Sequence, residues 1–325
     1  MQQLPSVDWD AAIAAGSMVL PAGPRLEADE VEQVVEALRQ AAVQAEGHIA
    51  QVTELDAPAD AQILVVDRAG WLKACTQSAA ALIEGAGGGA PEPTSSWERA
   101  RAKALGGQAG VVFAAIATRI LGQFDPFRQP SRLLLVAPNI VAVERELAVI
   151  PSDFRLWVCL HEETHRFQFG HAPWLREHLL SLVAELLADD ELAFGWNSDE
   201  TGLTRRLIGS PQQREAFDQA TAVMSLLEGY ADVMMDRVGT SVVPSYRSIR
   251  AAFDQRRAGG GGWLSWVQKM LGFDLKNAQY REGAEFCRAV IDSADVATLN
   301  RSLEAPGLLP SLAELRDPQR WLHRL

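Results

Sequence analysis

Hydrophobic residues recur at helical spacing through most of the chain. In residues 27–47, apolar side chains at Val31, Val34, Val35 and Leu38 form one stripe, which predicts an amphipathic helix. Similar patterns predict helices at 71–83, 95–122, 140–150, 173–191, 211–238, 245–257, 263–270, 277–292 and 311–323. The pattern therefore favours a chain that is mainly α-helical.

Two segments follow a different pattern, which is typical of strands. The sequence AQILVVD (61–67) is short and rich in β-branched residues, as strands usually are. The sequence SRLLLVAPN (131–139) contains a continuous apolar run, which predicts a strand that is buried on both faces. With few strands and many helices, the expected fold class is mainly α, of the α+β type.

A glycine- and proline-rich stretch, EGAGGGAPEP (84–93), is the best candidate for a boundary within the chain, because these residues interrupt regular structure. It divides the chain into an N-terminal α/β portion (1–90) and a helical portion (91–325). The two portions can equally form one compact unit.

Composition narrows the class of protein. An apolar fraction of 48% and a charged fraction of 22% in 325 residues are ordinary for a globular protein. The net charge of −12 argues against nucleic acid and against an anionic membrane surface, since both attract clustered Lys and Arg. The most apolar segment (105–122) is too short and too polar to span a bilayer.

The beginning of the chain and the cysteines predict a cellular location. The first twenty residues have no basic region and include Asp8 and Asp10, unlike a secretory signal. Cys75, Cys159 and Cys287 are scattered, odd in number and without CxxC spacing, which indicates free thiols in a reducing compartment. We therefore expect a cytoplasmic protein.

The sequence HEETH (161–165) is an H-E-x-x-H motif. On a helix, His161 and His165 lie on one face, so both imidazoles can bind one zinc ion. Glu162 lies about 100° further round the helix, where its carboxylate can accept a proton from a zinc-bound water. The motif predicts a zinc site with Glu162 as general base.

The residues around the motif support a helix. Trp157, Leu160, Thr164 and Phe167 form a stripe that can bury one side while the histidines face a cleft. Pro151 ends the preceding segment, and either Ser152 or Asp153 can cap the helix that carries the motif.

A catalytic zinc usually has three protein ligands, and two residues compete for the third position. His171 lies ten residues after His161, the offset of the last histidine in the longer H-E-x-x-H-x-x-G-x-x-H motif. Here, however, Gln168 occupies the position of the glycine that allows the chain to turn back. A helix that continues past Gln168 would carry His171 away from the ion.

Glu228 is the favoured alternative. It lies in MSLLEGYADVMMDRVG (224–239), where an apolar stripe predicts a helix that ends at Gly239. Asp232 is four residues further on and shares a helix face with Glu228. Glu228 can complete a His–His–Glu set, and Asp232 can accept a hydrogen bond from a ligand histidine and fix its tautomer.

Other polar residues have weaker support. His178, Tyr246 and Tyr280 can each stabilise an oxyanion or polarise a carbonyl, but nothing in their spacing selects them over a structural role. Tyr280 and His171 are kept as candidates for substrate contact or an alternative ligand. Glu163 and Tyr230 are expected to point away from the metal, since each lies about 200° from a ligand on its helix.

The chain resembles a known family nearly end to end. The similar segments are VDWDAAIAAG (7–16), LDAPADAQILVVDRAGW (55–71), LGQFDPF (121–127), RLLLVAPNIVAVEREL (132–147), FRLWVCLHEETHRFQFGHAPWLREHL (154–179), LLEGYADVMMD (226–236) and LKNAQYREGAEFCRAV (275–290). They resemble the zincin-like metallopeptidases, once catalogued as a domain of unknown function. Many members are labelled as associated with the biosynthesis of a deazaflavin coenzyme.

The resemblance implies a zincin core whose metal helix spans about residues 155–169. The wider gluzincin pattern carries over onto His161 and His165 as ligands, Glu162 as base, Glu228 as third ligand and Asp232 as its partner. Family members often have a small residue where this chain has His171, which implies a site that does not use that histidine.

The sequence thus predicts a zinc-dependent hydrolase that cleaves a peptide or small amide substrate. Two alternatives stay open at this point. One is a zincin-like binding or regulatory protein without turnover. The other is a hydrolase of a non-peptide amide in cofactor metabolism.

Overall fold

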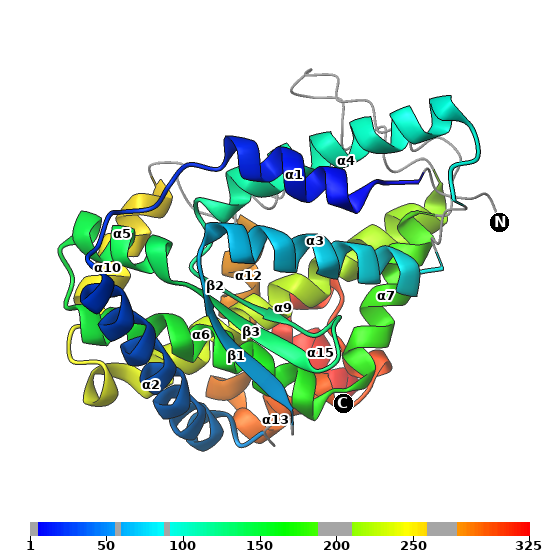
Figure 1. The fold of residues 1–325 in the computed structure, drawn as a ribbon. Coiled ribbons are helices and arrows are strands. Elements are labelled where there is room, and N and C mark those ends of the chain that lie inside the picture. The colour runs from blue at the N-terminus through cyan, green and yellow to red at the C-terminus, as the bar shows by residue number, and fades with distance from the viewer. Residues whose placement is uncertain (1–5, 56–59, 88–91, 188–209, 259–277) are drawn as a thin grey trace.

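A three-stranded sheet lies among the helices of the computed structural model (Figure 1), which describes residues 6–55, 60–87, 92–187, 210–258 and 278–325. The side chains at 253–258 and 278–281 are outside this description. The strands are β1 (Ala61–Val66), β2 (Gly122–Asp125) and β3 (Ser131–Val136). β3 is central, parallel to β1 and antiparallel to β2.

Helices make up most of the described chain. In chain order they are α1 (Trp9–Val19), α2 (Ala28–Thr53), α3 (Arg68–Gly85), α4 (Ser96–Ala117), α5 (Ala137–Leu147), α6 (Pro151–His171), α7 (Trp174–Leu186), α9 (Pro211–Val242), α10 (Tyr246–Ala258), α12 (Ala278–Ser293), α13 (Val296–Asn300), α14 (Leu312–Arg316) and α15 (Pro318–Arg324). The expected fold class, mainly α with a small sheet, is confirmed. The helix predicted at 263–270 lies outside the described residues.

Both faces of β3 are covered by helices, as the apolar run in its sequence predicts. Leu133 and Leu135 point into the larger core with α2, α6 and α9. Leu134 and Val136 point the other way and pack with Trp71 of α3 and the end of α4. Figure 1 shows α3 on one side of the sheet, with α1 and α4 beyond it, and α6 and α9 on the other side. The α6 helix, which carries the HEETH motif, therefore packs directly against the sheet.

Three local predictions were wrong. Residues 311–323 do not form one helix, because α14 ends at Arg316 and α15 begins at Pro318. Residues 95–122 do not form one helix, because α4 ends at Ala117 and the chain turns into β2 at Gly122. The α6 helix begins at Pro151 with Ile150 as its N-cap, and neither Ser152 nor Asp153 caps it. Asp153 instead accepts hydrogen bonds from the backbone N–H and hydroxyl of Ser245, so its carboxylate fastens α6 to the start of α10.

The sheet and the larger core both include residues from before and after position 90. β1 pairs with β3 along its whole length. Leu38 of α2 and Phe154 of α6 belong to the same hydrophobic cluster as Trp321 near the C-terminus. The division of the chain at 90 stays a prediction, and residues 88–91 of the proposed boundary lie outside the described part.

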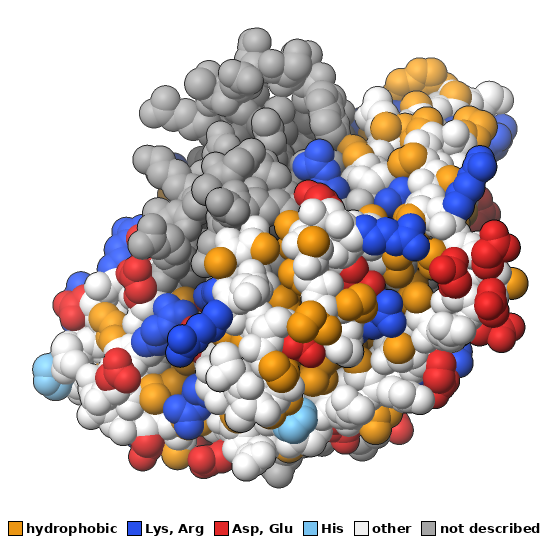
Figure 2. Space-filling model, turned by 90° about the vertical axis from the view of Figure 1, so that its left-hand side faces the viewer, with side chains coloured by type: hydrophobic (Ala, Val, Ile, Leu, Met, Phe, Trp, Pro, Cys, Tyr) orange, Lys and Arg blue, Asp and Glu red, His pale blue; other side chains and the backbone are white. Residues whose placement is uncertain are grey.

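Charged side chains of both signs are spread over the described part of the face shown in Figure 2, with small groups of hydrophobic side chains between them. A few acidic side chains gather at its right-hand edge. Within the described residues, no helix combines the length and the apolar character that crossing a bilayer requires.

Candidate metal centre

Three side chains from two helices converge beside the sheet. The Nε2 atoms of His161 and His165, both on α6, are 3.3 Å apart. The carboxylate of Glu228, on α9, has its Oε2 3.5 Å from His161 Nε2 and its Oε1 3.4 Å from His165 Nε2. Within the described chain, these three form the group of His, Cys, Asp and Glu side chains that can hold a metal ion.

The α6 helix is held in place by its apolar side. Leu160, Thr164 and Phe167 are fully buried, and Trp157 is nearly so, as the predicted stripe requires. The ring of Phe154 stacks on Trp157 at 6.0 Å. Because residues four apart share a face, burial of this stripe leaves both imidazoles on a partly accessible face.

The α9 helix brings Glu228 to the same place. Leu227, Met234 and Val238 of its predicted stripe are buried. The regular helix breaks at Gly239, whose φ of 64° lies in the left-handed region that glycine tolerates best. The prediction that this segment ends at Gly239 is thus close to the structure, although helical turns resume beyond it as far as Val242.

The spacing of the donor atoms fits zinc. Four ligands at 2.0–2.2 Å in a tetrahedron lie about 3.4 Å from one another. The separations of 3.3, 3.4 and 3.5 Å are close to that value, and the two that involve Glu228 run from its two different carboxylate oxygens, Oε1 to His165 and Oε2 to His161. Two imidazole nitrogens and one carboxylate oxygen are also a donor set that catalytic zinc uses, with one position left for a small ligand.

Electrostatics couples the same three groups. Burial lowers the pKa of His165, but the Glu228 carboxylate, together with Glu162 and the hydrogen bond to Gln168, outweighs this effect and raises that pKa to about 9. Burial alone would raise the pKa of Glu228, whereas the two histidines hold it well below its usual range. Glu228 therefore carries a negative charge that a cation can neutralise, and metal binding must release a proton from His165.

Glu162 lies next to this group and is 5% exposed. Its Oε2 accepts a hydrogen bond of 3.1 Å from the backbone N–H of Phe124 in β2. Burial raises its pKa, while the two histidines oppose that shift. A buried carboxylate with a raised pKa is a better proton acceptor than an exposed one.

The glycine at the start of β2 makes room for this carboxylate. A Cβ atom at Gly122 would lie 2.6 Å from Cγ of Glu162 and 2.9 Å from its Oε1. Carbon atoms in contact are usually about 3.5–4.0 Å apart, so no larger residue fits there while Glu162 keeps its position. Sequence reasoning missed Gly122, because its importance depends on β2 packing against α6.

Gln168 is a second residue that sequence reasoning missed as part of the site. It is fully buried, and its side-chain oxygen Oε1 is 2.9 Å from Nδ1 of His165. Its Nε2 donates to the backbone carbonyl of Leu227 at 3.1 Å. Gln168 therefore contacts a metal-site histidine directly and the residue that precedes Glu228.

Asp232 was expected to orient a ligand histidine, but among the described residues no hydrogen bond or ion pair joins it to either imidazole. Its two oxygens bind the guanidinium of Arg250 from α10, both at 2.5 Å, and Arg288 from α12 lies 3.6 Å away. Asp232 shares a face with Glu228, but one helical turn further along α9 that face meets α10 and α12. The hydrogen bond to His165 that was expected of Asp232 is therefore corrected, because the side chain beside Nδ1 of His165 is that of Gln168.

Among the described residues, the remaining candidates are not part of the donor set. His171 is the last residue of α6, so the helix continues past Gln168 and carries this side chain away from the other histidines. His178 packs edge-on against Trp174, and Tyr246 donates its hydroxyl to Asp236. The side chain of Tyr280 lies outside the described residues.

Two residues expected to point away from the metal make other buried contacts. Glu163 is fully buried and pairs with Arg166 at 3.1 Å, so it is salt-bridged although not solvated. Tyr230 donates its hydroxyl to Asn300 at 2.8 Å. Neither residue takes part in the donor set.

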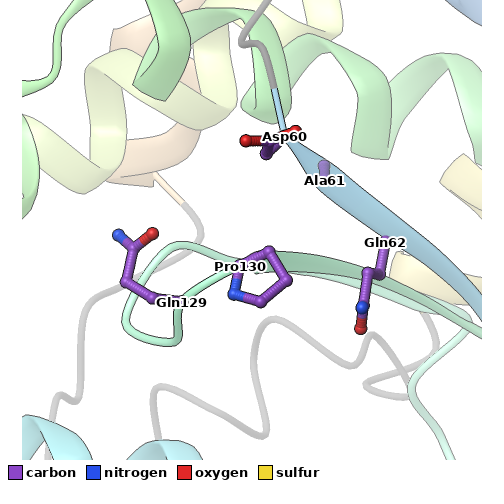
Figure 3. Close-up of a pocket in the computed structure, with 5 residues that line it drawn as sticks. All are labelled: Asp60, Ala61, Gln62, Gln129 and Pro130. Carbon is purple, nitrogen blue, oxygen red and sulfur yellow. The ribbon is translucent and has the colours of Figure 1, made fainter.

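A surface hollow at the other end of the sheet shares no residue with the metal centre (Figure 3). Ala61 and Gln62 of β1 line it together with Asp60, which directly precedes that strand, and Gln129 and Pro130 line it from the turn before β3. Among the described residues that line it, none is a histidine and Asp60 is the acidic one. The His–His–Glu group is therefore the better candidate for the functional site.

An α+β fold here brings two histidines and a glutamate together, with a buried carboxylate beside them, in an arrangement that can hold a metal ion. The comparisons agree with a site of this kind. The chain belongs to the zincin-like metallopeptidase family, which matches residues 7–322, so the resemblance seen in the sequence is confirmed.

A solved structure is also similar to this chain. It comes from Chloroflexus aurantiacus and is described as a candidate hydrolase with a novel fold. The two share 30% sequence identity with a TM-score of 0.72, over 98% of each chain. A comparison with curated proteins finds no match.

Proposed function

We propose that this protein is a zinc-dependent hydrolase of the gluzincin type that cleaves a peptide or small amide bond. The observation that carries the proposal is the convergence of His161, His165 and Glu228, with donor atoms 3.3 to 3.5 Å apart. Family membership and the similar candidate hydrolase support it.

The two histidines and Glu228 would hold the ion. A zinc ion in such a site acts as a Lewis acid, which lowers the pKa of a bound water and polarises a carbonyl oxygen. The negative charge of Glu228 would offset part of the charge of the ion. The position of the site between α6 and α9 leaves these groups only partly exposed, which strengthens electrostatic effects on a substrate.

Glu162 would act as general base and then as general acid. In the first role, a carboxylate oxygen of Glu162 accepts a proton from the water that attacks the carbonyl carbon. In the second, it returns that proton to the leaving nitrogen. Its burial and raised pKa favour both transfers, and the hydrogen bond from Phe124 fixes the orientation of the carboxylate.

The cysteines support a location in a reducing compartment such as the cytoplasm. Cys75, Cys159 and Cys287 are all free, and burial raises the pKa of each thiol. Cys159 and Cys287 are buried, and protonated, buried thiols are inert toward oxidation, so a structural role suits these two better than redox chemistry.

The test combines metal content with cleavage of a peptide library. Wild-type protein, stripped of metal and then given zinc, should retain about one ion per chain. His161→Ala with Glu228→Ala should abolish binding. Glu162→Gln should keep the zinc and lose at least about 100-fold in cleavage rate, whereas Glu36→Gln, on the exposed side of α2, should match wild type.

The outcomes separate the proposal from its alternatives. Wild-type protein without zinc, or zinc unaffected by loss of His161 and Glu228, would contradict the metal site. Zinc binding with no cleavage of any peptide would leave two alternatives, a binding protein or an enzyme for a non-peptide amide. A mixture of small N-acyl compounds as substrates then distinguishes those two.

A further inference from the structure

Gln168 contacts residues on both helices that carry the metal donors, His165 on α6 and Leu227 on α9. It is on α6, one turn after His165, and its side chain is fully buried. A primary amide that is removed from water without hydrogen-bond partners costs several kcal/mol or more, so buried amides are almost always bonded. The partners of Gln168 therefore determine which way its amide points.

One partner fixes the orientation of the amide. The backbone carbonyl of Leu227, 3.1 Å from Nε2 of Gln168, can only accept a hydrogen bond. The NH₂ group must therefore face Leu227, and the oxygen Oε1 must face the ring of His165.

The second partner then fixes the tautomer of His165. Oε1 of Gln168 is an acceptor, so Nδ1 of His165, 2.9 Å away, must carry a hydrogen. Nε2 is then the nitrogen with a lone pair to offer once His165 is neutral. It is also the nitrogen that faces His161 Nε2 at 3.3 Å and Glu228 Oε1 at 3.4 Å.

The bond to Leu227 also connects the two helices beside the third ligand. Leu227 directly precedes Glu228 in α9. A carbonyl oxygen has two lone pairs, so this one can serve the helix ladder and accept from Gln168 as well. Rotation of the His165 ring is thereby linked, through one rigid amide, to the position of the Glu228 backbone.

The two histidines differ in this respect. In the described part of the chain, no hydrogen bond is found for Nδ1 of His161. Among the described residues, the ring of His161 is held by Glu228 and His165, whereas the ring of His165 has a third contact, with Gln168, on its far side. His165 is thus the better oriented of the two before a metal binds.

We infer that Gln168 is a positioning residue for the metal centre: it holds His165 in the tautomer that binds through Nε2 and ties that ring to Glu228. The inference rests on the proposed zinc site and goes beyond it, because it assigns a neutral amide to a task that Asp232 was expected to perform. A neutral partner also adds no negative charge beside Glu162 and Glu228.

The experiment uses three variants of the full-length protein. Gln168→Leu removes both hydrogen bonds, and Gln168→Glu keeps the acceptor for His165 while losing the donor to Leu227. Gln213→Leu is the matched control, because Gln213 is also buried and donates Nε2 to a backbone carbonyl, that of Leu186 at 3.2 Å, outside the metal site. Zinc affinity is measured by competition with a chelator.

Loss of a residue that orients a metal ligand typically weakens binding about 10- to 100-fold, and we expect that loss in Gln168→Leu. Gln168→Glu should recover part of it, and Gln213→Leu should bind as wild type does. Nitrogen NMR of the zinc-loaded protein supplies a second readout. The Nδ1 proton of His165 should exchange slowly with solvent in wild type and in Gln168→Glu, and fast in Gln168→Leu.

Equal zinc affinity in wild type and Gln168→Leu, with equally slow exchange of the Nδ1 proton, would overturn the inference and leave the proposed function intact. Zinc affinity could also fall by the same factor in all three variants, Gln168→Leu, Gln168→Glu and Gln213→Leu. That result would show a general packing effect and would also overturn the inference. The expected order of zinc affinities across the variants, together with a wild-type protein that cleaves neither peptides nor small N-acyl compounds, would support the inference and contradict the proposed hydrolysis.

Discussion

Replacing Gly122 by alanine should displace the carboxylate of Glu162 while leaving the three metal donors in place. The new Cβ would lie 2.6 Å from Cγ of Glu162, and its three nearest atoms all belong to that side chain. Since carbon atoms in contact lie about 3.5–4.0 Å apart, the carboxylate must retreat by about 1 Å. Its hydrogen bond from Phe124 would lengthen as well.

A displacement of about 1 Å in a reacting group can lower a catalytic rate about 100-fold. We therefore expect Gly122→Ala to reduce hydrolysis by about that factor with zinc stoichiometry unchanged. The backbone itself should accept alanine, because Gly122 is not among the glycines with positive φ. The effect on rate is measured with whichever substrate the peptide library yields.

Stability offers a test that needs no substrate. Overpacking a buried site costs about 1–3 kcal/mol, so Gly122→Ala should lower the free energy of unfolding by that amount in urea titrations. Removing the crowded side chain with Glu162→Ala should recover most of this loss, since the two changes are coupled. Gly47→Ala is the control: nothing lies within 4 Å of its added Cβ, and alanine favours a helix.

Two results would refute this reasoning. If Gly122→Ala hydrolyses as fast as wild type, then Glu162 either tolerates the displacement or is not the base. If the cost of Gly122→Ala is the same with and without the Glu162 side chain, then the alanine clashes elsewhere and the close contact between β2 and α6 is misplaced.

Three further predictions concern stability. Gly283→Ala should lower the free energy of unfolding in urea by about 3 kcal/mol or more, since its Cβ would lie 1.9 Å from the carbonyl oxygen of Ser225 where α12 meets α9; a neutral effect would contradict that contact. Arg132→Met should cost about 3–5 kcal/mol by the same assay, because it leaves the buried Asp125 without its cation, and adding Asp125→Leu should restore much of the loss. Removing zinc with a chelator should lower Tm, since a ligand at 1,000 times its Kd contributes about 4 kcal/mol; an unchanged Tm would speak against the site.

The sequence was sufficient to predict the burial of an element where that burial depends on the element's own residues. The apolar run in β3 predicted burial on both faces, and Leu133 to Val136 are fully buried. The stripe on α6 predicted which side of the helix is covered, and Leu160 and Phe167 are fully buried. In these cases local periodicity and the final environment agree, because the same side chains determine both.

The sequence was insufficient to predict an element that forms only by contact with a distant part of the chain. β2 is only four residues long, and it forms because Gly122 and Phe124 pair with Leu135 and Leu133 of β3. The apolar residues before it continue the pattern of α4, so the periodicity extends the helix too far. The role of Gly122 could not be found in the same way, because the close approach of Glu162 comes from a different part of the chain.

The case of Asp232 and Gln168 shows how spacing can indicate the right face and still select the wrong residue. Asp232 follows Glu228 by four positions and does share its face, but α9 has by then passed α6 and meets Arg250 and Arg288. Gln168 follows His165 by three positions on the helix that carries both histidines, so it stays beside the site wherever α9 crosses. The residue whose side chain replaces the glycine of the longer motif, and so excludes His171, is also the one that contacts His165. A contact within one helix was therefore the more reliable signal, because it does not depend on the crossing of two helices.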